Sequence, residues 1–369
     1  MAFHAISLFS GCGGDTLGLE MAGFKVVAFS ELKPTIAKSH LANFPDSAHI
    51  KDSKGKTGDI TKIEDGQFSK YKGLPVDLVF AGFPCQGFSR AGKKLETDPR
   101  NQMFRQFVRV TKEVRPLFVI GENVVGLEKF KSGPNVGDPL MIDCIKAAFS
   151  EIGYGLIYKV HEATAFGVPQ KRKRLLIVGW DTTRLPEFKA KEATLWTSIA
   201  RLGALKQMAL PRSFVSNTME GAYLIPTASV PDGFDAYALA VAEDAEPLGI
   251  PHPYVVLKVG QNLLSCTKRD SPVHSEIVNL DAPMKTIICT YGHQPRLLVG
   301  LRKPSGASYA RCLTPDELKQ VQGFPSSYKL EGSTGEKIIQ IGNAVPPPMI
   351  ECVAKALKAV KAVAVELLA

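Results

Sequence analysis

Short apolar runs alternate with stretches of helical periodicity along the first half of the chain. The apolar runs that suit buried strands are residues 5–10, 25–30, 76–82, 117–123, 156–160 and 174–180. The stretches that suit helices lie between them, at 16–23, 34–44, 101–114 and 139–153. Strands that alternate with helices predict an α/β fold with a doubly wound, mainly parallel sheet. In such a sheet, ligands bind at the carboxyl ends of the strands.

Apolar periodicity is weaker after residue 185, where Pro, Gly and Ser are frequent. Strand-like segments occur at 254–260, 276–280 and 284–292, and helical ones at 311–325 and 348–368. We therefore expect three parts. They are a sheet domain at 1–185, a smaller, mostly β domain at 186–336, and a C-terminal segment at 337–369 that packs back on the sheet domain.

Composition narrows the class of protein. Hydrophobic residues make up 45% of the 369 positions and charged residues 22%, which is typical of a globular protein. No apolar run approaches the roughly 18 residues of a membrane helix, and the N-terminus lacks the basic start of a signal peptide. Seven cysteines are scattered without a CxxC pair. This favours a reducing, intracellular location and argues against a disulfide framework or a metal site.

The net charge of +9 is clustered along the chain. A basic surface alone is compatible with any soluble protein. Here, however, Lys93, Lys94 and Arg100 follow one short loop, and a QKRKR run occupies 170–174. Clustered Lys and Arg side chains favour phosphate contacts, so nucleic acid is a candidate partner.

Three features suit a nucleotide-type cofactor at the strand ends. The run FSGCGGDTLG at 9–18 ends a strand with glycines that permit a tight turn before a helix. Glu31 ends the second strand about 20 residues later, where a carboxylate can accept bonds from ribose hydroxyls. Asp59 could bond an adenine amino group, with Ile60 packed on the ring. Each feature is a weak signal by itself. The glycines also occur in an ordinary strand–helix connection, an acidic residue such as Glu31 is common at the start of a helix, and Gly-Asp is a common turn sequence.

Candidate chemistry lies at the next strand ends. Cys85 follows a buried strand in VFAGFPCQGFS, and a thiolate there is a strong nucleophile, although a single cysteine is more often a small buried hydrophobe. Glu122 ends another strand in FVIGENV and would face the same crevice, where it could donate a proton. Arg172 and Arg174 would share one face of a strand and suit a base carbonyl and a phosphate, unless the run is only a solvated basic edge.

Taken together, these motifs closely resemble those of the DNA (cytosine-5-)methyltransferases of compact prokaryotic or viral type. The matching segments, in the family's order, are FSGCGG, the acidic residue after the second strand, PCQ, ENV, QKRKR, RCLTPDELKQVQGFP and IGNAVPPP. They cover nearly all of 1–180 and 311–350. The resemblance implies an S-adenosylmethionine-dependent methyltransferase fold, and it places the variable target-recognition domain within 186–336.

The resemblance also implies roles for individual residues. Cys85 would add to C6 of a flipped-out cytosine, Glu122 would contact N3 and the exocyclic amine, and Asn123 would hold that loop. Arg174 would bind the base carbonyl, while Arg172 would support the DNA backbone or the site. The methyl group would come from S-adenosyl-L-methionine, leaving S-adenosyl-L-homocysteine, and no metal is needed.

The cofactor-binding positions implied by the resemblance are Phe9, Gly11, Gly13, Gly14, Glu31, Leu32, Asp59, Ile60, Asn343 and Val345. Leu32 stands where the family often has an aromatic residue, so we expect aliphatic packing on the adenine. The candidate DNA-binding residues are Gln86, Ser89, Arg90, Arg100, Gln170, Arg269 and Gln294. The expected partners are double-stranded DNA and a separately acting restriction endonuclease. We expect a monomer with no membrane contact.

Three alternatives compete with this interpretation. An RNA cytosine methyltransferase of the tRNA-acting branch would carry Cys-Phe-Thr in the recognition region, where this chain has SCTK at 265–268. A catalytically silent family member would lack the PCQ cysteine or the ENV glutamate, and both are present. A dehydrogenase would share the glycine turn but would not explain PCQ, ENV or QKRKR. The target DNA sequence is not readable from the chain.

Overall fold

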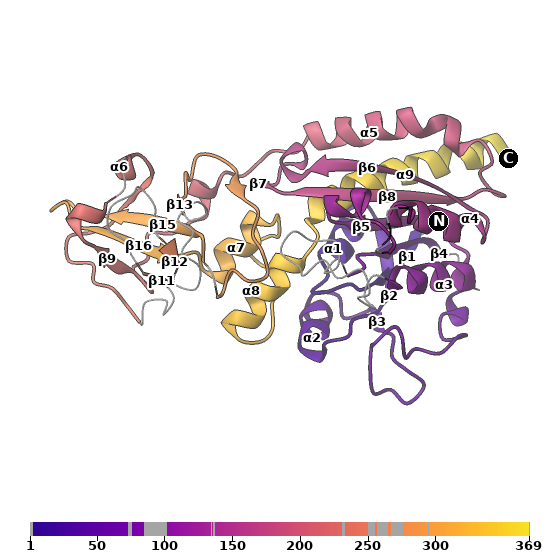
Figure 1. The fold of residues 1–369 in the computed structure, drawn as a ribbon, viewed down its shortest axis with the longest axis horizontal. Coiled ribbons are helices and arrows are strands. Elements are labelled where there is room, and N and C mark those ends of the chain that lie inside the picture. Colours follow the sequence, from indigo (N-terminus) through magenta and orange to yellow (C-terminus); the bar gives the residue numbers. More distant parts are fainter. Residues whose placement is uncertain are drawn as a thin grey trace.

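A computed structural model describes most of the 369 residues. The described ranges are 3–72, 76–84, 102–133, 135, 137–230, 233–249, 255–256, 265–266, 276–293 and 295–368. The chain forms two lobes, each built around its own sheet (Figure 1).

The larger lobe is built on a seven-stranded sheet with the order β3-β2-β1-β4-β5-β8-β6. Its strands are β1 (Phe3–Leu8), β2 (Phe24–Phe29), β3 (Ala48–His49), β4 (Val76–Ala81), β5 (Phe118–Asn123), β6 (Tyr154–Glu162) and β8 (Lys173–Asp181). The pairs among β1 to β5 are parallel, whereas β8 is antiparallel to both β5 and β6. The predicted mainly parallel α/β sheet is therefore confirmed. The strand order reverses between β1 and β4, which marks the place where such sheets bind ligands.

Helices cover both faces of this sheet (Figure 1). They are α1 (Gly14–Met21), α2 (Pro34–Asn43), α3 (Phe104–Val114), α4 (Met141–Ser150), α5 (Glu192–Ala204) and α9 (Pro347–Leu368). One hydrophobic cluster joins α1, α5 and α9 to one face of the sheet, and a second joins α3 and α4 to the other face. Phe188, Leu195 and Ile199 belong to the first cluster, so the core of the larger lobe extends beyond residue 185.

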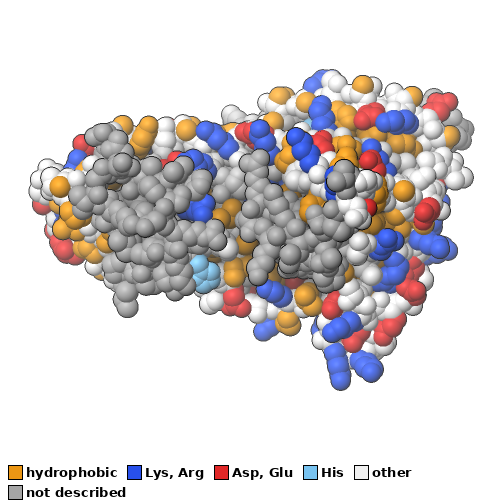
Figure 2. Space-filling view, in the orientation of Figure 1, with side chains coloured by type: hydrophobic (Ala, Val, Ile, Leu, Met, Phe, Trp, Pro, Cys, Tyr) orange, Lys and Arg blue, Asp and Glu red, His pale blue; other side chains and the backbone are white. Residues whose placement is uncertain are grey.

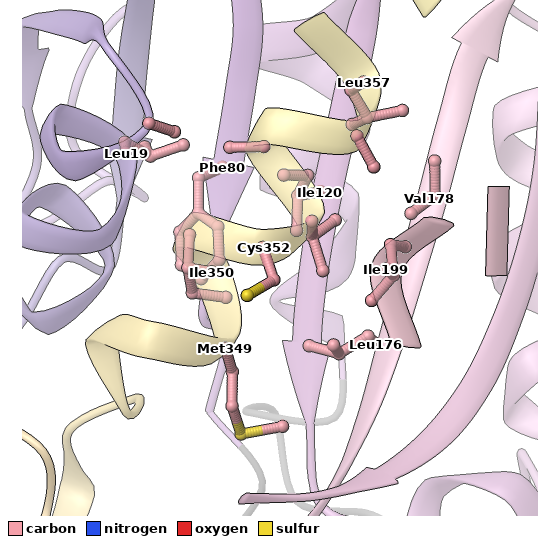
Figure 3. Packing of buried hydrophobic residues seen from close by; sticks show 14 of the residues in the cluster. Leu19, Phe80, Ile120, Leu176, Val178, Ile199, Met349, Ile350, Cys352 and Leu357 are labelled. Carbon is pink, nitrogen blue, oxygen red and sulfur yellow. The ribbon is translucent and has the colours of Figure 1, made fainter. Parts of the chain in front are cut away.

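The C-terminal helix α9 is a central part of that core. Figure 3 shows four side chains of α9 packed in one cluster with side chains of the sheet. Those of α9 are Met349, Ile350, Cys352 and Leu357, and those of the sheet are Phe80, Ile120, Leu176 and Val178. All eight side chains are fully buried. Because α9 also packs on α1, the C-terminal helix supports the first helix.

The smaller lobe contains a sheet with the order β10-β15-β16-β9, in which β13 also pairs with β15. These strands are β9 (Tyr223–Ile225), β10 (Leu239–Ala240), β13 (Glu276–Ile277), β15 (Leu297–Arg302) and β16 (Ser308–Cys312). A separate pair is formed by β11 (Val255–Val256) and β12 (Ser265–Cys266). The lobe's helices are α6 (Phe234–Tyr237), α7 (Pro315–Val321) and α8 (Thr334–Asn343). The additional, smaller β domain that the sequence predicts is thus present.

A short parallel pairing connects the two lobes. It joins β7 (Gln170–Lys171), just before β8, to β14 (Met284–Lys285) of the region beyond residue 185.

None of the helices in the described ranges is long and apolar enough to cross a membrane.

Removing the side chain of Leu357 tests the contribution of α9. The Leu357→Ala variant should lose about 2–5 kcal/mol of unfolding free energy, because a fully buried side chain is replaced by a cavity. Leu205→Ala is the matched control, since Leu205 is 81% exposed, and it should change stability by less than about 0.5 kcal/mol. Urea unfolding measures both. Equal losses would mean that α9 does not belong to the cooperative core.

Candidate active site

The carboxyl ends of β1, β2, β4 and β5 carry most of the residues that the sequence analysis singled out. Because the neighbouring strands are parallel, their following segments meet at one edge of the sheet. The turn 9–14 follows β1, Glu31 follows β2, and Glu122 and Asn123 end β5.

The turn after β1 has an unusual backbone. Phe9 has φ 55°, a left-handed conformation that is uncommon for a residue with a side chain. The turn is held by a bond from Ser10 N to Ser30 O of 3.0 Å and one from Gly13 N to Ser10 O of 2.9 Å. Such non-glycine strain concentrates at functional sites, where the surroundings enforce it.

Two glycines of this turn have no room for a side chain. A Cβ atom at Gly13, whose φ is 93°, would lie 2.8 Å from Tyr328 Oη and 2.9 Å from Phe44. A Cβ atom at Gly14 would overlap the carbonyl of Val345. By contrast, a Cβ atom at Gly11 would meet no atom within 4 Å. The turn is therefore packed on its inner side and open at Gly11, which leaves space for a ligand to approach the backbone there.

Glu31 is fixed beside the open part of the turn. One carboxylate oxygen accepts from Gly11 N at 3.1 Å and the other from Lys33 N at 2.8 Å. Burial raises the pKa of Glu31, and the backbone donors oppose that shift. Each oxygen keeps a further acceptor position, so this carboxylate fits the ribose hydroxyls of a nucleoside.

Asp59 and Ile60 lie in a turn that packs against the Glu31 backbone. A Cβ atom at Gly58 would overlap the carbonyl of Glu31, which explains the glycine of GDI. Asp59 accepts from the Thr61 hydroxyl at 2.8 Å and from Thr61 N at 3.1 Å, and Ile60 is buried. Leu32, next to Glu31, is 57% exposed. These residues fit an adenine with an aliphatic contact.

The segment after α8 closes the same region. Asn343 is exposed at the end of α8, and Val345 is buried against the glycine turn. A Cβ atom at Gly82, just after β4, would contact both Val345 and Phe9 O within 4 Å. Phe9, Gly82 and Val345 therefore lie together, although they are far apart in the sequence.

Glu122 and Arg174 form an ion pair at the ends of β5 and β8. Arg174 Nε lies 2.7 Å from Glu122 Oε1, and the two side chains are only 13% and 11% exposed. Asn123 donates from Nδ2 to Phe83 O at 3.2 Å, while its own oxygen accepts from Val124 N at 2.9 Å. The end of β5 is thus tied to the segment Phe83–Pro84 that precedes Cys85.

Arg172 and Gln170 differ from the sequence-based expectation. Both side chains are buried, with exposures of 2% and 0%. The guanidinium of Arg172 donates to Ile287 O, Gly342 O and Ala344 O at 2.9–3.2 Å. The amide of Gln170 donates to Gln322 Oε1 and accepts from Ile287 N. Strand alternation fails at 172 because β7 ends at 171, so Arg172 does not share a strand face with Arg174, and in this structure the side chains of Gln170 and Arg172 join the two lobes.

Seven of the predicted site residues lie outside the described residues: Cys85, Gln86, Ser89, Arg90, Arg100, Arg269 and Gln294.

Figure 2 shows Lys and Arg side chains spread from the junction of the lobes across the larger lobe, interspersed with Asp and Glu. On this face the described basic side chains therefore do not form one continuous patch.

The sequence analysis missed a layer of side chains beneath the glycine turn. Asp15 and His40 are buried there, and Tyr328 donates from its hydroxyl to Cys12 O at 2.6 Å. Asp15 lies within the motif FSGCGGDTLG, whose residue types alone predict only a glycine turn before a helix. A polar Ser7 within an otherwise apolar strand was the available signal for a buried partner.

A doubly wound sheet with a glycine turn after β1 and a carboxylate after β2 defines a class of α/β proteins that bind a nucleotide-containing cofactor at the strand ends. A family model described as C-5 cytosine-specific DNA methylase matches residues 3–227 and 260–359. The chain therefore belongs to the C-5 cytosine-specific DNA methylases. Its activity is the S-adenosylmethionine-dependent methylation of cytosine at C5 in DNA. The match to this family confirms the predicted family and enzyme class.

Curated relatives of this chain align with it over almost its whole length. Type II methyltransferase M1.HphI of Haemophilus parahaemolyticus is 29% identical over 383 aligned positions, covering 97% of this chain and 87% of the relative. Type II methyltransferase M.Eco47II of Escherichia coli is 30% identical and covers 96% and 78%.

Solved structures support the fold. The Dnmt2 methyltransferase of S. pombe superposes with a TM-score of 0.60 at 16% identity, covering 97% of this chain and 99% of that chain. The methyltransferase EhMeth of Entamoeba histolytica also gives 0.60, at 15% identity, covering 98% and 99%.

The packing at Gly13 gives a test of the turn. Gly13→Ala places a side chain at positive φ, at about 1–2 kcal/mol, and forces it against Tyr328 and Phe44, at about 1–3 kcal/mol more. Gly306→Ala is the control, because its φ is 91° but nothing lies within 4 Å of the added atom. Urea unfolding should show the larger loss at Gly13. Equal losses would mean that backbone strain alone decides the residue.

Proposed function

We propose that Cys85 is the nucleophile of this methyltransferase and attacks C6 of a cytosine flipped out of double-stranded DNA. The observation that carries this proposal is the hydrogen bond that joins the end of β5 to the segment before Cys85. Asn123 holds the Phe83 carbonyl, two residues before Cys85, while its neighbour Glu122 is paired with Arg174. A carboxyl group and a guanidinium beside the segment that leads to a cysteine suit the addition of a thiolate to a polar ring.

Glu122 and Arg174 would act on the base. Glu122 contacts N3 and the exocyclic amine, and it supplies a proton to N3 as the Cys85 sulfur adds to C6. Arg174 binds the base carbonyl, and its present bond to Glu122 orients both groups before the base arrives. Addition makes C5 electron-rich enough to take the methyl group. Loss of the C5 proton and elimination of the Cys85 thiolate then restore the aromatic ring.

The cofactor would be held by the turn 9–14, Glu31, Leu32, Asp59, Ile60, Asn343 and Val345. When bound, S-adenosyl-L-methionine supplies an electrophilic methyl group, and no metal takes part. Glu31 would accept bonds from the ribose hydroxyls, because its two oxygens are already fixed by backbone donors. Asp59 and Ile60 would hold the adenine, with Leu32 in aliphatic contact.

DNA would lie across the junction of the lobes. A base inside a duplex cannot expose its ring face, so flipping is required at a cost of a few kcal/mol. Gln86, Ser89, Arg90 and Arg100 would hold the phosphates or fill the gap. The lobe within 186–336, with Arg269 and Gln294, would read the target sequence. Arg172 and Gln170 act as positioning residues that join this lobe to the catalytic one.

The names of the relatives indicate the biological setting. They are Type II methyltransferases, so we propose that this enzyme protects DNA inside a cell against a restriction endonuclease that acts separately. We propose a monomer, because one chain supplies every residue of the mechanism.

Replacing the nucleophile tests the core of the proposal. Cys85→Ser should lower methyl transfer to duplex DNA by more than about a thousandfold while S-adenosylmethionine binding stays within about twofold. Cys144→Ser serves as the matched control, since Cys144 lies on α4 and should leave transfer unchanged. Transfer of a labelled methyl group is the measurement. Turnover by the Cys85 variant would refute the assignment.

Glu122→Gln tests the proton donor. The methyl-transfer rate should fall by about 10²–10⁴ while DNA affinity changes little, because the glutamine keeps the shape but cannot donate the same proton. Glu128→Gln, on the following turn, is the control. Single-turnover kinetics separate the two effects. Equal losses in rate and in DNA binding would show a structural role for Glu122.

Bisulfite sequencing of treated duplex DNA tests the whole function. Protected cytosines in one short recurring context are expected. Folded protein that binds cofactor yet protects no DNA would contradict a DNA substrate and redirect the assay to RNA.

A further inference from the structure

A buried carboxyl group lies directly beneath the glycine turn. Asp15 opens α1 and is 2% exposed. Ser7 of β1 donates its hydroxyl to Asp15 Oδ2. The hydroxyls of Ser10 and Thr16 lie 3.5 and 3.4 Å from the carboxyl oxygens. Within the described ranges, no Lys or Arg forms an ion pair with Asp15, so only hydroxyl and backbone groups support it.

Among the described residues, the other titratable groups around Asp15 provide no positive charge. His40 of α2 contacts Thr16 at 3.0 Å, and burial lowers the pKa of His40 to about 3, so the ring is neutral. Cys12 and Tyr328 lie in the same buried layer. Burial is the main cause that raises the pKa of each, and nearby acidic groups raise it further. Glu31, across the turn, is acidic.

An ionised Asp15 is therefore costly for the fold. Burial raises the pKa of Asp15 to about 7, against the smaller opposing effect of the hydroxyl and backbone donors. Because the folded-state pKa is above the unfolded one, this group favours folding most at low pH, and the benefit is lost as pH rises through about 7. An asparagine at this place would avoid the cost. A costly buried charge at a ligand-binding turn points to a role in binding.

We propose that Asp15 is a positioning residue whose carboxylate, held by Ser7 and Ser10 beneath the turn, favours the positively charged S-adenosylmethionine over its uncharged-sulfur product. The inference rests on the proposed function of the turn as the cofactor site. The sulfonium gives the substrate one more positive charge than S-adenosylhomocysteine. A carboxylate in a poorly solvated place discriminates between them more strongly than one in water.

The proposal makes the preference for substrate over product depend on pH. Substrate binding favours ionised Asp15, so substrate affinity falls as pH drops below about 7. The product lacks the sulfonium, and its affinity changes less. Taking the ratio of the two affinities removes effects common to both ligands, such as titration elsewhere in the site.

Calorimetric titration of the full chain with each ligand at pH 6 and pH 8 tests this. For the wild type, the affinity ratio of S-adenosylmethionine to S-adenosylhomocysteine should be about fivefold higher at pH 8 than at pH 6, which corresponds to a shift of the Asp15 pKa by about one unit on substrate binding. Asp15→Asn should give a lower ratio that is the same at both pH values. Asp316→Asn is the matched control, because it also opens a helix but its side chain is 82% exposed. It should behave as the wild type.

Thermal unfolding supplies a second readout. Asp15→Asn should raise Tm above that of the wild type, with a larger gain at pH 8 than at pH 5.5, because it removes a buried charge. A wild-type ratio that does not change with pH overturns the proposal, as does a pH-dependent ratio that Asp15→Asn retains. The wild-type measurement suffices if the variant does not fold. A folded wild type that binds neither ligand overturns the cofactor role of the turn itself, a result distinct from either of these.

Discussion

The structure depends on a close backbone approach between the start of α1 and the segment that leads into α9. Gly14 lies against the Val345 carbonyl, and a Cβ atom at Gly18 would lie 2.5 Å from Pro347 O. A larger residue at either glycine position would force α1 away from this segment. Since α9 fills the core over the sheet and also supports the turn after β1, this one contact joins the last part of the chain to the proposed cofactor site.

The junction between the lobes relies on buried polar groups. Arg172 donates to carbonyls from both the 287 region and the end of α8, and Gln170 bonds to Gln322 and Ile287. A buried guanidinium whose bonds are satisfied by carbonyls has a defined geometry, because each broken bond leaves a desolvated polar group. The junction therefore sets how the smaller lobe faces the strand ends, where the proposed base-binding pair Glu122–Arg174 lies.

Much of the larger lobe was predictable. Strands of buried Val, Ile, Leu and Phe alternate with amphipathic helices, and β4 and β5 begin and end within a residue of the expected positions. Local sequence decides these elements because the side-chain period and the glycine turns are local properties. The pairing of β7 with β14 was not predictable, since it brings together residues more than 100 positions apart through backbone bonds that carry no residue-type signal.

The sequence by itself determined the family and the α/β class, and it supplied the candidates for the chemical groups, since all of these follow from residue types at set spacings. Only the tertiary structure decided what each arginine contacts. Arg172 and Arg174 are two positions apart, yet Arg172 is buried and donates to backbone carbonyls, whereas Arg174 pairs with Glu122. The two side chains differ because the strand is interrupted at residue 172. The burial of Asp15 among hydroxyls likewise depends on β1, α1 and α2 packing together. Burial and partners arise from distant segments, and these set whether a charged group binds, reacts or supports the fold.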